Sequence, residues 1–120
     1  MKVLLAEDDL DIRRIYTEML SGNGFEVFSA VDGEEVLTKV GEQAFDLLIL
    51  DLFMPRVDGF EALSRMREQG QMIPVIVMTG HFPDEVVDER IQGLGVSVIL
   101  RKPVMISTLL DAVKKAIGPG

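Results

Sequence analysis

Short runs of aliphatic residues alternate along this chain with longer segments in which apolar residues recur every three or four positions. The aliphatic runs predict five strands, near residues 2–6, 25–29, 46–50, 74–78 and 97–100. The segments between and after them predict five helices, near residues 10–21, 33–41, 59–68, 84–93 and 107–117. Because the strands are continuously aliphatic, we expect a parallel sheet that is buried on both faces.

Side chains within the helical segments indicate which face is buried and where a helix begins. In the first helix the predicted apolar stripe consists of Ile12, Ile15, Met19 and Leu20. Acidic caps followed by a glutamate three residues later are predicted at Asp32 and Asp58. Pro83 fits the first position of the fourth helix, where its missing N–H costs nothing.

Direct alternation of strands and helices requires right-handed crossover connections. We therefore expect an α/β fold with a doubly wound, five-stranded parallel sheet of order 2-1-3-4-5, flavodoxin-like, with helices on both faces. The length of 120 residues predicts a single domain, 1–120, with a core of about 2–117 and a tail or linker at 118–120.

Composition narrows the possible classes of function. The 48% of hydrophobic residues fits a globular protein, and the lack of cysteine excludes disulfides and thiolate metal sites. The net charge of −8 argues against nucleic-acid binding by this chain. No signal peptide is visible and no apolar run approaches membrane-spanning length, so we expect a cytoplasmic protein with no membrane partner.

Polar residues come at the ends of four aliphatic runs: Glu7 and Asp8 at the first, Asp51 at the third, Thr79 at the fourth and Lys102 at the fifth. Ligands of open parallel sheets bind beyond the carboxyl ends of the strands, so these residues should converge on one edge. Grouped carboxylates suit a hard divalent cation, Mg²⁺ or Mn²⁺. A carboxylate can also attack phosphorus, while an ammonium and a hydroxyl bind phosphoryl oxygens.

The order and spacing of these motifs resemble the receiver domain of two-component response regulators, from about Lys2 to Ile117. The matching segments are Leu5-Ala6-Glu7-Asp8-Asp9, Asp51-Leu52-Phe53-Met54-Pro55 followed by Asp58-Gly59, Met78-Thr79-Gly80, and Gly95 seven residues before Lys102-Pro103. The resemblance implies a phosphoacceptor module of a two-component or phosphorelay system. It also implies that the domain catalyses only its own phosphorylation and dephosphorylation and is not an enzyme acting on an external substrate.

The resemblance also implies roles for individual residues. Asp51 is expected to receive a phosphoryl group from the phosphohistidine of a histidine kinase or phosphotransfer protein. Asp8 is a direct metal ligand, Glu7 acts largely through water, and Asp51 and the backbone carbonyl of Phe53 complete the protein's metal ligands.

By the same resemblance, Thr79 and Lys102 bind phosphoryl oxygens, and Thr79 moves on activation. The surface of the fourth helix, fifth strand and fifth helix then binds a downstream effector domain or protein.

The residues leave three alternatives open. An Asp8–Asp9 pair could replace Glu7–Asp8 at the metal. An aspartyl-phosphate phosphatase or phosphotransferase would need a second aspartate two residues after the nucleophile, where Phe53 stands. A degenerate docking module would need an acid, the threonine or the lysine to be missing, and all are present.

The chain departs from the family pattern at several positions. Ile99 replaces a residue that is often aromatic, so the aromatic switch coupled to threonine should be absent or altered. Gly80 should loosen its loop, and Met105 lacks the oxygen of a good helix cap. Phe53 and His81 flank the expected approach of hydrolytic water, and Phe53 is predicted to shield the phosphorus.

Overall fold

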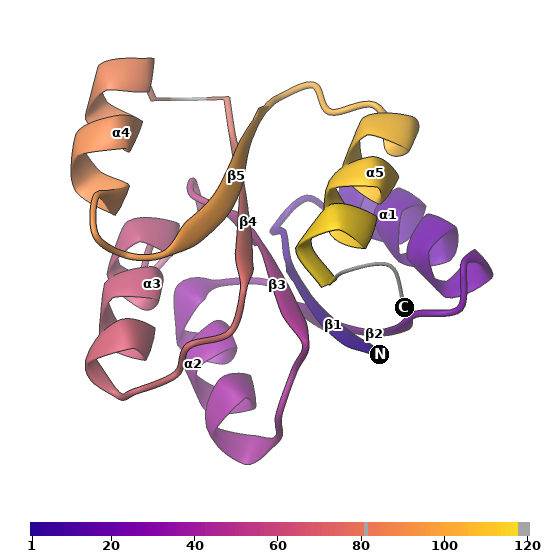
Figure 1. Ribbon diagram of the computed structural model, residues 1–120, viewed down its shortest axis with the longest axis horizontal. Helices are drawn as coiled ribbons and strands as arrows, with labels where there is room; N and C mark the ends of the chain where they lie inside the picture. The colour runs from indigo at the N-terminus through magenta and orange to yellow at the C-terminus, as the bar shows by residue number, and fades with distance from the viewer. Residues whose placement is uncertain (81, 118–120) are drawn as a thin grey trace.

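The sheet of the computed structural model contains five parallel strands in the order β2-β1-β3-β4-β5 (Figure 1). Its strands are β1 (Lys2–Ala6), β2 (Glu26–Ala30), β3 (Leu47–Asp51), β4 (Val75–Thr79) and β5 (Val96–Arg101). The helices are α1 (Leu10–Gly22), α2 (Gly33–Glu42), α3 (Gly59–Glu68), α4 (Asp84–Ile91) and α5 (Ile106–Ile117). The predicted fold class and strand order are confirmed.

The structure describes residues 1–80 and 82–117. The predicted tail or linker at 118–120 and the predicted role of His81 therefore fall outside the described residues.

The helices form two layers around the sheet. Figure 1 shows α1 and α5 on one face and α2, α3 and α4 on the other. Each face has its own apolar core, because alternate residues of a strand point to opposite sides. The central strands β3 and β4 are buried along their whole length, whereas the edge strands β2 and β5 are partly exposed. This burial explains the continuous aliphatic runs of the central strands.

Several details differ from the sequence-based expectation. Strands β2, β3 and β4 begin and end one residue later than predicted, so Asp51 and Thr79 are the last residues of their strands. Ile15 was predicted in the buried stripe of α1 but is 49% exposed, and Tyr16 occupies the buried position. Pro83 lies immediately before α4 rather than at its first helical position, and its carbonyl accepts the first hydrogen bonds of that helix.

Two predicted helix caps are confirmed. The carboxylate of Asp32 accepts a hydrogen bond from the N–H of Glu35 at 2.8 Å. The carboxylate of Asp58 accepts one from the N–H of Glu61 at 2.9 Å. These bonds satisfy main-chain donors that would otherwise lack a partner at the starts of α2 and α3.

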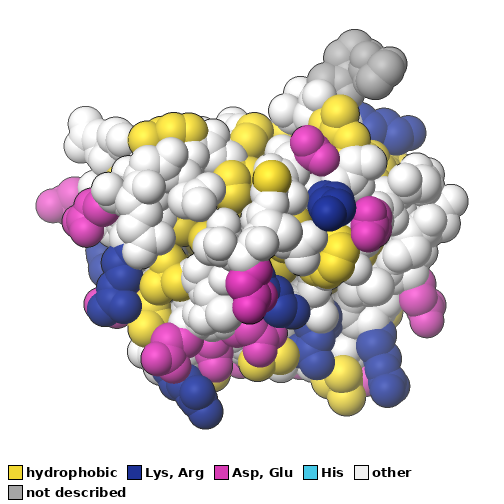
Figure 2. Space-filling view, turned by 90° about the horizontal axis from the view of Figure 1, so that it is seen from below, with side chains coloured by type: hydrophobic (Ala, Val, Ile, Leu, Met, Phe, Trp, Pro, Cys, Tyr) yellow, Lys and Arg dark blue, Asp and Glu magenta, His cyan; other side chains and the backbone are white. Residues whose placement is uncertain are grey.

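The face of the molecule in Figure 2 mixes acidic, basic and apolar side chains. Among the described helices, none combines the length and the apolar character that crossing a membrane requires.

Candidate functional site

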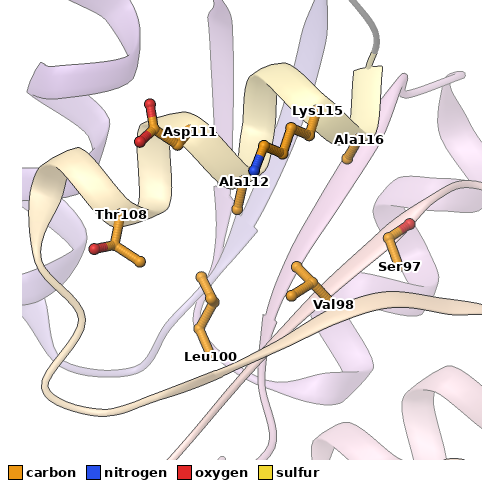
Figure 3. A pocket seen from close by; sticks show the side chains of 8 residues that line it. All are labelled: Ser97, Val98, Leu100, Thr108, Asp111, Ala112, Lys115 and Ala116. Carbon is orange, nitrogen blue, oxygen red and sulfur yellow. The ribbon is translucent and has the colours of Figure 1, made fainter.

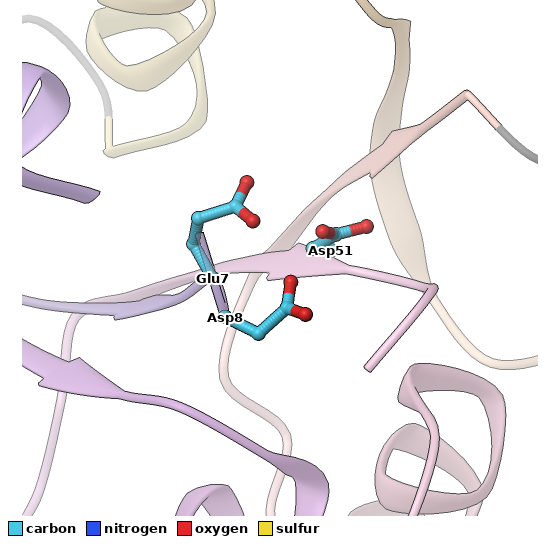
Figure 4. A group of neighbouring side chains, drawn as sticks. All are labelled: Glu7, Asp8 and Asp51. Atoms are coloured by element: carbon cyan, nitrogen blue, oxygen red, sulfur yellow. The ribbon is translucent and has the colours of Figure 1, made fainter. Parts of the chain in front are cut away.

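Three carboxylates lie together beyond the carboxyl ends of two neighbouring strands (Figure 4). Glu7 and Asp8 directly follow β1, and Asp51 ends β3, which pairs with β1 in the sheet. One oxygen from each side chain lies within 4.8 Å of the others. Glu7 and Asp51 are 0% and 2% exposed, whereas Asp8 is open to solvent. Glu7 and Asp51 therefore form the buried part of this group of carboxylates, and Asp8 forms its solvent-accessible part.

The third acid of this segment has a different role. Asp9 is the N-cap of α1, and its carboxylate accepts a hydrogen bond from the N–H of Ile12 at 3.0 Å. A side chain engaged with the first turn of a helix satisfies main-chain donors there. The geometry therefore groups Glu7 and Asp8, rather than Asp8 and Asp9, with Asp51.

Lys102, directly after β5, places its ammonium between the two buried acids. Its Nζ lies 2.8 Å from Oδ2 of Asp51 and 2.9 Å from Oε1 of Glu7. Burial alone would lower the pKa of Lys102, but the hydrogen bonds to Asp51 and Glu7 outweigh it, so this pKa is raised. The side chain is therefore a cation held against both carboxylates. The peptide bond from Lys102 to Pro103 is cis.

Two of the acids, Glu7 and Asp8, have pKa values above their ordinary ones. Burial raises the pKa of Glu7 above its ordinary value of 4.5; the hydrogen bond from Lys102 opposes this and the charge of Asp51 adds to it. Partial burial raises the pKa of Asp8, and its proximity to Glu7 adds to the effect. A divalent cation bound among these oxygens would favour their ionised forms.

Thr79 contributes a hydroxyl from the end of β4. The residue is 1% exposed, and its Oγ1 is buried without a hydrogen-bond partner among residues 1–80 and 82–117. Buried hydroxyls are normally paired, and leaving one unpaired costs about 1–3 kcal/mol. An orphaned donor at the edge where the acids and Lys102 meet fits a ligand that brings acceptor oxygens.

The turn after β3 is fixed by close contacts around Asp51. The N–H of Phe53 donates to Oδ1 of Asp51 at 3.1 Å, a hydrogen bond that orients this carboxylate. Gly59 approaches the same strand end so closely that a Cβ would lie 2.7 Å from the carbonyl oxygen of Asp51. A glycine is therefore required at the start of α3. The Phe53 side chain is 51% exposed beside the site.

Sequence reasoning missed two side chains of α1 that contact the main chain next to these residues. Arg13 donates to the carbonyl of Glu7, and the hydroxyl of Tyr16 donates to the carbonyl of Val104. The signal available for Tyr16 was an aromatic residue with a polar end next to the predicted apolar stripe. No local pattern indicated the contact of Arg13.

The donor set fits a hard divalent cation together with a phosphoryl group. Carboxylate oxygens are the ligands that Mg²⁺ prefers, and three of them meet here. The ammonium of Lys102 and the buried hydroxyl of Thr79 supply donors for anionic oxygens.

Comparison with known families gives the same result. Residues 3–114 match the family model of the response regulator receiver domain. The chain belongs to this family. It is a receiver domain of the kind found in two-component signalling.

Receiver domains of known sequence and structure support this membership. The chain is 36% identical over 116 residues to response regulator MprA of Mycobacterium leprae (strain TN), which covers 95% of this chain and 50% of that protein. It is 37% identical over 112 residues to MprA of Mycobacterium avium (strain 104), covering 92% and 48% of the two chains. The chain thus spans about half the length of the curated relatives it matches.

Solved receiver structures have the same fold. The receiver domain of the Francisella response regulator 1452 is 30% identical with a TM-score of 0.89, covering 97% of this chain and 95% of that one. The chemotaxis protein CheY4 of Vibrio cholerae is 32% identical with a TM-score of 0.87, covering 96% and 97%.

Proposed function

We propose that Asp51 is the phosphoacceptor of this receiver domain and that it receives the phosphoryl group from the phosphohistidine of a histidine kinase or phosphotransfer protein. The carboxylate oxygen attacks phosphorus, the phosphorus–nitrogen bond breaks, and the imidazole leaves with the bonding electron pair. The observation that carries the proposal is the placement of the Lys102 ammonium 2.8 Å from the Asp51 carboxylate, at an edge where the Thr79 hydroxyl has no partner among the residues that the structure describes.

Mg²⁺, or Mn²⁺, would be held by Glu7, Asp8, Asp51 and the backbone carbonyl of Phe53, with Glu7 acting largely through water. The bound cation would neutralise charge on the transferred phosphoryl group. The fit of three carboxylates within 4.8 Å supports this assignment.

The other residues of the site would stabilise the transferred group. Lys102 would exchange its contact with Asp51 for a phosphoryl oxygen, and Thr79 would donate its hydroxyl to another. Positioning and charge stabilisation are the main sources of catalysis in phosphoryl transfer. The domain would thus catalyse its own phosphorylation and dephosphorylation without acting as an enzyme on an external substrate.

The test is incubation with acetyl phosphate and Mg²⁺, followed by intact mass measurement. Native protein should gain one phosphoryl group, and Asp51→Asn should gain none. Asp58→Asn is the matched control, because Asp58 is a helix cap close in sequence and asparagine caps equally well. Undiminished labelling of Asp51→Asn would reject the assignment.

Two other functions receive less support. A phosphatase with an aspartyl-phosphate intermediate needs a general acid two residues after Asp51, and the side chain there is Phe53. A docking module without phosphoryl chemistry would not need Glu7 and Asp51 paired with Lys102 in a buried place. Removing these charged groups from water costs free energy, so their burial favours a role in chemistry.

The output surface is proposed to be formed by α4, β5 and α5, contacting a downstream effector domain or protein. A groove of about 720 Å³ lies between β5 and α5, on the face of the sheet that carries α1 and α5, and its lining includes Val98 and Leu100 of β5 and Thr108, Asp111 and Lys115 of α5 (Figure 3). We place residues 1–120 in one domain and expect it to act in the cytoplasm.

Within this surface, Ile99 of β5 occupies the position that is often aromatic in the family, and its side chain is half-buried. A phosphoryl mimic such as beryllofluoride should therefore change the chemical shifts of α4 and β5 while the burial of Ile99 stays nearly constant. A large change in the burial of Ile99 would contradict this expectation.

A further inference from the structure

Two side chains of α1 contact the two loops that carry the charged groups of the site. Nη1 of Arg13 lies 2.9 Å from the carbonyl oxygen of Glu7 and 3.4 Å from that of Asp8. The hydroxyl of Tyr16 donates to the carbonyl of Val104 at 2.9 Å, two residues after Lys102. Arg13 and Tyr16 are three positions apart, so they lie on the same side of the helix.

We propose that Arg13 and Tyr16 are positioning residues: Arg13 fixes the turn that bears Glu7 and Asp8, and Tyr16 fixes the loop that bears Lys102. The inference rests on the proposed function, since it assigns these contacts a purpose in metal binding and phosphoryl transfer. Helix α1 would thereby set the distance between the acids and the ammonium.

The contact of Arg13 has the features of a positioning bond. Strand β1 ends at Ala6, and the N–H of Glu7 makes one further hydrogen bond, to the carbonyl of Ala30. The Glu7 carbonyl is held at 2.9 Å by a cationic donor, with a longer contact to the Asp8 carbonyl at 3.4 Å. Short bonds from a charged donor are about twice as strong as neutral ones. Arg13 is half-buried, whereas its neighbour Arg14 is exposed. The two arginines therefore form a matched pair for experiment.

The contact of Tyr16 also restrains a short segment of main chain. Its ring is 6% exposed and belongs to the core between the sheet, α1 and α5. A buried ring leaves its hydroxyl little freedom, so the bond holds Val104 at a fixed place relative to α1. Because Val104 follows Lys102 by two residues, the position of the lysine main chain is restrained from both sides, by β5 and by this bond.

The test of Arg13 measures the Mg²⁺ dissociation constant by isothermal titration, with melting temperatures taken in EDTA. Arg13→Gln should weaken Mg²⁺ binding by about 10-fold, the loss typical of residues that orient metal ligands. Arg14→Gln should leave it within about twofold, and Arg13→Lys should recover part of the loss. A merely structural role would lower the melting temperature without changing the Mg²⁺ dissociation constant, and that result would overturn the assignment of Arg13.

The test of Tyr16 uses Tyr16→Phe, which removes one hydroxyl and keeps the ring. The rate of phosphorylation by acetyl phosphate should fall about 10-fold, because small displacements of a catalytic group are costly. Its Mg²⁺ dissociation constant should stay within about twofold of native, since the acids are held separately. Thr17→Val, which removes a hydroxyl from the next residue of α1, is the control and should retain the native rate. An unchanged rate in Tyr16→Phe would overturn the role of Tyr16.

If Asp51 is not a phosphoacceptor, the outcome differs from those that would overturn the roles of Arg13 and Tyr16. Native protein would then take up no phosphoryl mass, whereas the Mg²⁺ dissociation constants would still decide the role of Arg13. The NMR signal of the Lys102 ammonium would decide the role of Tyr16 in the same case. A shifted or broadened signal in Tyr16→Phe supports positioning, and an unchanged signal overturns it.

Discussion

The backbone N–H of Lys102 donates to the carbonyl of Thr79 at 2.8 Å. This bond joins the end of β5 to the end of β4, next to the two side chains proposed to bind phosphoryl oxygens. The ammonium and the hydroxyl are therefore connected through the main chain, so a displacement of one strand end acts directly on the other.

Thr79→Val should make the unphosphorylated protein more stable while impairing phosphorylation. The substitution removes a buried hydroxyl that has no partner among the described residues, and the free energy of unfolding should rise by about 1 kcal/mol. Urea unfolding in EDTA measures this gain, and intact mass after acetyl phosphate measures the loss. Thr79→Ser, which keeps the hydroxyl, is the control. If valine brings no gain in stability, the hydroxyl has a partner in solution.

Lys102→Met should destabilise the metal-free protein and tighten Mg²⁺ binding. Removing the ammonium leaves the buried carboxylates of Glu7 and Asp51 without their counter-charge, a loss of about 3 kcal/mol. The same removal ends the repulsion between ammonium and metal, so Mg²⁺ should restore much of the stability. Thermal unfolding with and without Mg²⁺ measures both effects, with exposed Lys114→Met as control. Weaker Mg²⁺ binding in Lys102→Met would contradict the argument.

Stability in EDTA should depend on pH through Glu7. Because burial raises the folded-state pKa of Glu7 above 4.5, the native state binds this proton more tightly than the unfolded chain. The resulting stabilisation is fully present below pH 4.5 and is lost as the pH rises through the raised pKa. Glu7→Gln remains neutral, so its stability advantage over native protein should grow between about pH 4 and pH 7. Urea unfolding across this range tests the prediction, which fails if the difference is constant.

Phe53→Asn should shorten the lifetime of the phosphorylated protein. The half-exposed phenylalanine ring, 6.2 Å from that of Phe82, offers bulk but no hydrogen bond to an attacking water. Asparagine can orient water, so decay in Mg²⁺ after donor removal should accelerate by about 10-fold. Phe53→Leu keeps the apolar bulk and should decay at nearly the native rate. Equal rates for asparagine and phenylalanine would show that residue 53 does not shield the phosphorus.

Met105→Asp should stabilise the domain by about 1 kcal/mol, the usual value of a helix cap. Met105 immediately precedes α5; its carbonyl accepts from the N–H of Leu109 at 3.0 Å, and its side chain is 69% exposed. An aspartate there can accept from the first turn and also interacts favourably with the helix dipole. Thermal unfolding measures the gain against Met105→Ala. An aspartate variant no more stable than the alanine variant would rule out the cap.

The fold class could be predicted from the alternation of aliphatic runs with helical segments, and the grouping of the acids from their positions at the ends of strands. Parallel strands place their last residues at one edge, so Glu7 and Asp51 meet whatever the details of the helices. Helical spacing places Tyr16 among Ile12, Met19 and Leu20, whereas Ile15 lies at the edge of that face; Ile15 was predicted instead because its side chain is purely apolar. What the sequence could not reveal is the hydrogen bond from the Tyr16 hydroxyl to Val104, because that residue is 88 positions away and is brought near only by the packing of α1.

Contacts of residues with a distant main-chain carbonyl could not be predicted from the sequence either. Gly59 is recognisable as part of a motif, but its contact with the carbonyl of Asp51 depends on how α3 docks against β3. The bond from Arg13 to Glu7 likewise depends on the angle between α1 and the sheet. Such contacts are set by packing between elements, which local periodicity does not encode.

The contact between Glu7 and Lys102 joins residues that are 95 positions apart. No fragment lacking either the first or the last strand can assemble this pair, so uptake of a phosphoryl group reports on the integrity of nearly the whole chain. Proteolytic nicking or deletion at either end should abolish labelling even where most of the sheet survives. Mass labelling can therefore serve as a folding assay, one that counts only molecules whose two terminal regions have come together.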